Sequence, residues 1–142
     1  MDRRRTLALA SVAIALAACA GQAADIGTPD LVDALSAGGG SVELGGPVQQ
    51  AFFAVEGRSL TLNGSVVQVF EYPSVSAREA DSALISPDGS EIGTTMVTWV
   101  DQPTFWAKGK LIVLYVGRDQ AIIDLLAGAL GEPITEPWPT PG

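Results

Sequence analysis

The sequence of 142 residues contains no histidine, a single cysteine, and only 8 basic residues against 16 acidic ones. The lack of histidine excludes Ser–His–Asp and Cys–His catalytic sites, and any zinc, haem or copper centre with histidine ligands. One cysteine cannot form an intramolecular disulfide. The net charge of −8 argues against nucleic acid as a partner, because phosphate binding needs a basic surface. The length suits one domain with short appendages.

Long apolar runs are scarce, and the main one lies close to the N-terminus. Arg3, Arg4 and Arg5 precede an Ala/Leu-rich run that extends from Leu7 to Ala18. As a helix this run would span roughly 18 Å, whereas the hydrocarbon core of a bilayer is about 30 Å thick. The basic start and the short apolar core therefore predict a signal peptide over residues 1–18, not a transmembrane helix.

The end of this segment, Leu16-Ala17-Ala18-Cys19, resembles the lipobox of bacterial lipoproteins. The resemblance implies that a peptidase cleaves before Cys19, that the Cys19 thiol carries a diacylglyceryl group, and that its freed amine is acylated in many bacteria. The structural alternative is a buried cysteine beside an ordinary cleavage site. The lipoprotein interpretation predicts a partner, the membrane, and a location on the cell membrane or outer membrane, facing the periplasm or the cell exterior.

The residues from Asp2 to Leu7 also resemble a twin-arginine export signal. They differ from it at Thr6, where a large apolar residue is usual, and no lysine follows. Export of the folded protein and ordinary secretion therefore both stay open.

The composition divides the remaining chain into three parts. Removing residues 1–18 takes away three arginines and one aspartate, which leaves a side-chain charge of −10. Residues 19–27 are small and polar, and they are predicted to form a lipidated tether. Residues 28–131 form the expected globular domain. Residues 132–142 are rich in proline and are expected to be a flexible tail, since this composition favours an extended chain.

Periodicity and turn signals predict an α+β fold, an antiparallel sheet of about six or seven strands packed with three helices, in the order α-β-β-β-β-α-β-β-β-α. The expected helices cover residues 28–37, 76–84 and 120–130. The expected strands cover residues 41–44, 51–55, 58–62, 65–72, 94–100, 105–107 and 110–116. The predicted N-caps are Thr28, a capping box of Ser76 with Glu79, and Asp119.

Two strand patterns carry particular information. Asn63-Gly64 favours a type I′ turn between two strands whose inward face is formed by Leu60, Leu62, Val67 and Val69. The residues Leu111–Val116 are apolar on both faces, which is typical of an interior strand.

Candidate sites are few. The acidic residues are dispersed, and no spacing indicates a catalytic pair, so no catalytic, metal or cofactor-binding residue is predicted. Asp88-Gly89-Ser90-Glu91 lacks the alternation of a full calcium loop. The glycines at 38–40 end a helix, whereas a phosphate loop precedes one.

A candidate interaction surface lies at the tip of the last predicted hairpin. Trp106, Lys108 and Lys110 combine an aromatic side chain with positive charges that are rare in this acidic chain. The structural alternative is a core tryptophan beside a solvated turn, which is the favoured interpretation for Trp99 and Tyr115.

These observations predict a membrane-anchored, non-enzymatic domain outside the cytoplasm that binds a protein or small-molecule ligand. The alternative is an extracytoplasmic hydrolase that uses carboxylate or Ser/Thr groups. Three strings, at residues 68–72, 85–89 and 111–117, are similar to small exported bacterial proteins of unassigned function, a resemblance that implies no activity.

Overall fold

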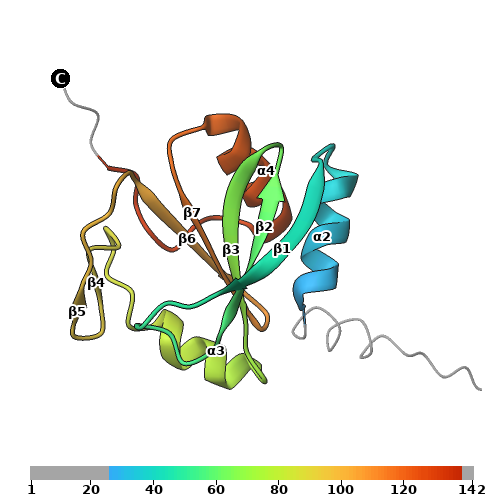
Figure 1. Cartoon of the computed structure of the whole chain (residues 1–142). Helices are drawn as coiled ribbons and strands as arrows, with labels where there is room; N and C mark the ends of the chain where they lie inside the picture. The colour runs from blue at the N-terminus through green and yellow to red at the C-terminus, as the bar shows by residue number, and fades with distance from the viewer. Residues whose placement is uncertain (1–25, 139–142) are drawn as a thin grey trace, which may run out of the picture.

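The structure of the chain is a computed structural model and describes residues 26–138. Its elements are α2 (Thr28–Ala37), β1 (Val42–Val48), β2 (Gly57–Leu62), β3 (Ser65–Glu71), α3 (Val75–Ser82), β4 (Glu91–Ile92), β5 (Thr95–Met96), β6 (Pro103–Lys108), β7 (Leu111–Val116) and α4 (Gln120–Leu130) (Figure 1). The predicted α+β class and its three helices are confirmed over these residues. Five strands form an antiparallel sheet in the order β1-β2-β3-β7-β6, while β4 and β5 pair separately. The predicted signal peptide and Cys19 lie outside the described residues.

The hairpin of β2 and β3 has the predicted turn and the predicted inward face. Asn63 and Gly64 have φ angles of 50° and 86°, as a type I′ turn requires. The four predicted inward residues are at most 2% exposed, and Leu60 lies opposite Val67 in the register. Phe70 is fully buried on the other face, which the pattern had predicted to be less buried.

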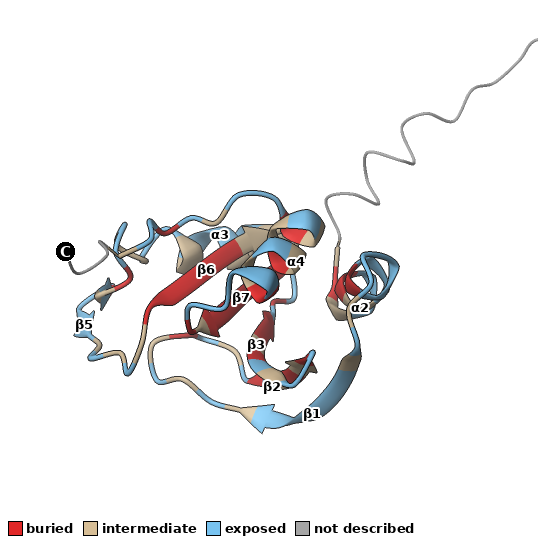
Figure 2. Cartoon of the chain, turned by 90° about the horizontal axis from the view of Figure 1, so that it is seen from above, coloured by how far each residue is buried: buried red, intermediate tan, exposed pale blue. Residues whose placement is uncertain are grey.

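Strand β7 lies inside the sheet, as predicted, and separates two hydrophobic cores. Leu111, Val113 and Tyr115 contribute to the core that α2 and α4 cover. Ile112 and Leu114 contribute to the core on the other face, which the 49–56 loop, α3 and the residues around β4 cover. Figure 2 shows that buried residues concentrate in β3, β6 and β7, while β1 is largely exposed along one edge of the sheet.

The helix caps agree with the predictions at one helix and differ at two. Asp119 caps α4 by accepting the N–H of Ala121 at 3.0 Å, as predicted. The N-cap of α3 is Ser74, two residues before the predicted one. The N-cap of α2 is Gly27, which has an extended backbone and whose N–H donates to the Asp30 carboxylate at 2.9 Å.

The predicted strand at residues 51–55 is wrong. This segment is a turn whose Phe53 packs into the second core, and its Ala54 N–H donates to Asp81 of α3 at 2.9 Å. The same carboxylate oxygen accepts the Tyr72 hydroxyl at 2.7 Å. The 94–100 strand is also shorter than predicted, since only Thr95–Met96 pair as strand. Tertiary contacts hold both segments out of the main sheet.

The structure differs from the expected domain boundaries at both ends. The carbonyl of Ile26 accepts the N–H of Lys110 at 3.0 Å, so the folded body begins within the predicted tether. Residues 132–138, expected to be part of a flexible tail, run beside β6. There the Ile134 N–H donates to the Phe105 carbonyl at 2.8 Å, and the Phe105 N–H donates to the Thr135 hydroxyl at 3.0 Å.

Candidate functional site

The predicted interaction surface at the β6–β7 turn is wrong in its main residue. Trp106 is fully buried in the core beneath α4, and its indole N–H donates to the Gly131 carbonyl at 3.1 Å. Lys108 is half-buried, with Nζ 3.5 Å from the Ala129 carbonyl at the end of α4. Lys110 is also half-buried. The structure therefore does not bring Trp106, Lys108 and Lys110 together as one exposed surface.

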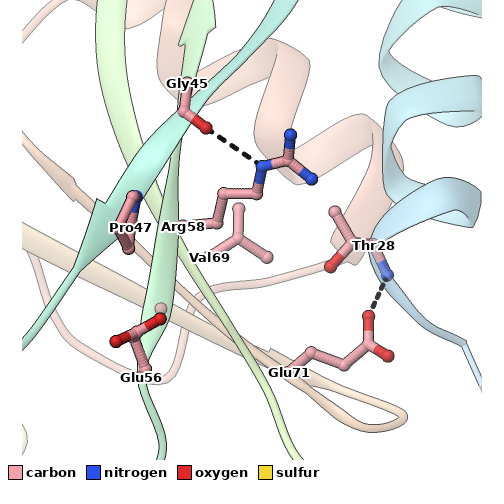
Figure 3. Close-up of a pocket in the computed structure, with 8 residues that line it drawn as sticks. Thr28, Gly45, Pro47, Glu56, Arg58, Val69 and Glu71 are labelled. Atoms are coloured by element: carbon pink, nitrogen blue, oxygen red, sulfur yellow. Dashed lines mark hydrogen bonds between the residues drawn. The ribbon is translucent and has the colours of Figure 1, made fainter.

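A groove opens instead between the N-terminal end of α2 and strands β1, β2 and β3 (Figure 3). It has two adjoining lobes of about 480 and 530 Å³, and both are lined by Thr28, Arg58 and Glu71. The first lobe is completed by Gly45, Pro47, Glu56, Gly57 and Val69. The second lobe is completed by Pro29, Val32, Asp33 and Leu44. Each lobe has the volume of a small-molecule site.

A β-bulge in β1 positions Arg58 in this groove. The pairing of β1 with β2 shifts between Leu44 and Pro47, which leaves two glycines outside the regular register. A Cβ on Gly45 would overlap the Ser59 hydroxyl, which would have to rotate away to admit any larger residue. The Gly45 carbonyl accepts a hydrogen bond from Arg58 Nε at 3.0 Å and thereby orients the guanidinium group.

The terminal nitrogens of Arg58 are available to a ligand. Figure 3 shows them directed away from Gly45, into the space between β1 and α2. Within residues 26–138, one ion pair has a nitrogen–oxygen distance below 4.0 Å, and it joins Arg118 to Asp101. No carboxylate of these residues lies that close to the nitrogens of Arg58. The two terminal nitrogens can therefore bind one planar anionic group side by side, a geometry that suits a carboxylate.

Glu71 places a fixed negative charge on the side of the groove next to α2. Its Oε1 accepts the Thr28 backbone N–H at 2.7 Å, one of the N–H groups that the first turn of a helix leaves without a helical partner. This hydrogen bond lowers the pKa of Glu71 below its usual value, against the opposing effect of partial burial. Glu71 is therefore ionised at neutral pH, and it ties the end of β3 to the start of α2.

The groove combines both signs of charge with apolar surface. Glu56 and Asp33 are exposed carboxylates on the first and second lobes. Val69 is 2% exposed and lies beneath the Arg58 side chain, and Leu44 is 44% exposed on the wall formed by β1. This arrangement can bind a molecule that carries an anionic and a cationic group on a small apolar framework.

Residues 26–138 contain no group of three acidic or cysteine side chains that could hold a metal ion. None of the helices in this part of the chain has the length and hydropathy of a membrane span. Asp88, in the segment that resembles part of a calcium loop, accepts hydrogen bonds from the Ser90 N–H and from the Ser86 and Ser90 hydroxyls. The Ser90 N–H contributes most to lowering the pKa of Asp88. These contacts order the turn itself.

The sequence patterns did not predict a site at Thr28, Arg58 and Glu71. A signal was present, because alternation continues the inward face of β2 from Leu60 to Arg58, and that of β3 from Val69 to Glu71. Two charged residues at the same end of an apolar face indicate where the core ends and an opening begins.

Comparison with known proteins identifies no relative. No family model matches the chain, and neither a curated protein nor a solved structure matches it significantly. The function of the chain therefore has to be inferred from its sequence and from the geometry of the described residues.

Proposed function

We propose that the chain is a lipid-anchored domain outside the cytoplasmic membrane that binds a small zwitterionic ligand, an amino acid or a short peptide, in the groove around Arg58. The observation that carries the ligand proposal is the guanidinium group of Arg58, oriented by the bulge and free of a carboxylate partner within residues 26–138. The lipid on Cys19 would hold this groove at the surface of the cell membrane or outer membrane.

The anchoring proposal rests on the lipobox resemblance and on simple energetics. Each buried methylene group contributes roughly 0.8 kcal/mol, so a single acyl chain binds reversibly whereas two or three chains anchor stably. Cys19→Ser should abolish labelling of the chain by radioactive palmitate and release it from membranes. Unchanged labelling would contradict the proposal.

The ligand proposal follows from the two kinds of charge in the groove. A ligand carboxylate would accept two hydrogen bonds from the terminal nitrogens of Arg58. A ligand ammonium group would lie toward the ionised Glu71 or toward Glu56 in the first lobe. The acidic character of the whole chain also favours a ligand with a cationic group over one that is only anionic.

The hydrolase alternative has one observation in its favour, since Glu56 and Glu71 line the same lobe. A carboxylate pair for hydrolysis needs a proton donor, which requires a raised pKa. The lowered pKa of Glu71 opposes that role and suits charge recognition. The geometry therefore supports binding better than hydrolysis.

The ligand proposal is tested by titrating the purified full chain with a set of dipeptides, each compared with its C-terminal amide and its N-acetyl form. We expect saturable binding of the free dipeptides by calorimetry, weakened by either cap. Because hydrogen bonds to a charged group are worth about 1.5–3 kcal/mol, Arg58→Gln should weaken binding by about 10-fold to 100-fold.

Arg118→Gln is the matched control, since Arg118 is an exposed arginine away from the groove lining. It should bind as the unchanged chain does. Equal affinity of free and capped dipeptides, or equal affinity of the Arg58→Gln variant, would contradict the proposal. Release of product from any of the dipeptides would instead favour the hydrolase.

A further inference from the structure

A second, smaller cavity lies between β6, α4 and the C-terminal segment. Its volume is about 130 Å³, and its lining residues are Gln102, Thr104, Gln120, Ile123, Pro133, Thr135 and Pro137. The polar side chains that are buried within residues 26–138 are Gln102, Thr104 and Thr135, which are 7%, 5% and 4% exposed. All three line this one cavity. Such convergence is unusual, because buried polar groups are costly unless each has a hydrogen-bond partner.

The protein satisfies only part of the hydrogen-bonding capacity around this cavity. Gln102 Oε1 accepts the Trp138 N–H at 2.9 Å, and the Thr135 hydroxyl accepts the Phe105 N–H at 3.0 Å. The Gln102 amide nitrogen and the Thr104 hydroxyl have no hydrogen bond to any described residue. Within the described residues no side-chain nitrogen or oxygen is both inaccessible and unpaired, so these two groups keep some accessible surface. The residues that carry them line the cavity.

The size and lining of the cavity indicate the class of molecule that fits it. A water molecule needs roughly 10–15 Å³ of such space, so the cavity is large enough for a small organic group. No residue that lines it carries a formal charge. Gln102 offers N–H donors, Gln120 offers an amide oxygen, and the threonine hydroxyls both donate and accept. Ile123 and the two prolines add apolar walls.

We infer that this cavity binds a neutral, hydroxylated ligand, namely a single sugar ring. Sugar hydroxyls donate and accept at once, which matches a lining that mixes donors with acceptors and has no charge. The apolar C–H face of a sugar ring suits the proline and isoleucine walls. A charged ligand would lose its hydration shell there without gaining a counter-charge. This site is separate from the groove around Arg58, with which it shares no residue.

The inference is tested by nuclear magnetic resonance on the purified full chain, titrated with glucose and with N-acetylglucosamine. We expect a saturable shift of the Gln102 side-chain amide signals with at least one of these sugars. Thr104→Val removes one hydroxyl at nearly constant volume and should weaken binding by about tenfold. Thr98→Val is the control, because Thr98 is exposed and does not line this cavity. The Arg58→Gln variant should bind the sugar normally, since Arg58 does not line it either.

Three outcomes would overturn the inference. The first is the absence of a saturable shift with either sugar up to about 10 mM, which corresponds to a binding free energy weaker than about 3 kcal/mol. The second is a set of shifts confined to residues of the groove around Arg58. The third is an unchanged affinity of the Thr104→Val variant for the sugar. Equal unfolding midpoints for the two threonine variants would show that any loss of affinity is local. A failure here leaves the dipeptide test unaffected, since that test reads a different site.

Discussion

Truncating Trp106 to alanine should remove a large part of the stability of this domain. The side chain is fully buried against residues of α2, α4, β3 and β7, and it is the largest of the fully buried side chains. Substituting a buried tryptophan by alanine typically costs about 3–5 kcal/mol, because the removed contacts leave a cavity that closes only in part. The lost hydrogen bond adds little, since Gly131 is exposed and water can replace the indole donor.

This cost is large relative to the total stability of a domain of this size, which is typically about 5–15 kcal/mol. With a guanidinium chloride slope of about 3–4 kcal/mol/M, a loss of 4 kcal/mol lowers the unfolding midpoint by about 1 M. The same loss lowers Tm by about 15 °C. Far-ultraviolet circular dichroism is the suitable signal, because it does not depend on the removed indole.

Met96→Ala is the control, because it also truncates a large apolar side chain but at a position that is 79% exposed. Its free energy of unfolding should stay within about 0.5 kcal/mol of the unchanged chain. If Trp106→Ala proved equally mild, the packing argument would be refuted, and the indole would be a surface group after all.

Three further predictions test single interactions. Gly57→Ala should lower the free energy of unfolding, measured with denaturant, by about 2 kcal/mol, because the new Cβ would lie 2.6 Å from the buried Phe70 ring. A much smaller effect would mean that the Phe70 ring can move aside. Asp119→Ala should cost about 1 kcal/mol through the lost cap of α4, whereas Asp124→Ala should not do so. The hydrogen bond from the Thr28 N–H lowers the native pKa of Glu71 below its unfolded value. Its contribution to stability is therefore complete above the unfolded pKa and is lost as the pH falls through the native pKa. Glu71→Gln should therefore lower the midpoint at pH 7 and flatten its fall toward pH 3, and an unchanged acid limb would contradict this.

Local signals in the sequence predicted those elements whose cause is local. The Asn63-Gly64 turn needs positive φ at two successive residues, a requirement that the dipeptide itself meets. Asp119 caps α4 through an N–H only two residues away. The interior position of β7 follows from apolar residues on both of its faces. In each case the residues that decide the structure lie within a few positions of one another.

The errors have a common physical cause, which is a contact that comes from far along the chain. The predicted strand over residues 41–44 ends before Gly45, yet pairing with β2 continues β1 through a bulge at Gly45 to Val48. Trp106 precedes a hairpin tip, but α4 returns across this face of the sheet and buries it. The proline-rich composition after Gly131 does favour an extended chain, and the edge of β6 then supplies hydrogen-bond partners that composition does not encode.

Both proposed sites lie where a polar residue continues an apolar face. Arg58 stands on the inward face of β2 two residues before Leu60, and Thr104 stands on the inward face of β6 two residues before Trp106. Leu60 and Trp106 are fully buried, whereas Arg58 itself is exposed in the groove and Thr104 is only 5% exposed, so a desolvation cost falls on Thr104 alone. The terminal nitrogens of Arg58 and the Thr104 hydroxyl have no partner among the described residues, so a ligand can supply a hydrogen bond to each of these groups. Reading strand faces for such interruptions therefore locates candidate sites in a chain that has no catalytic motif.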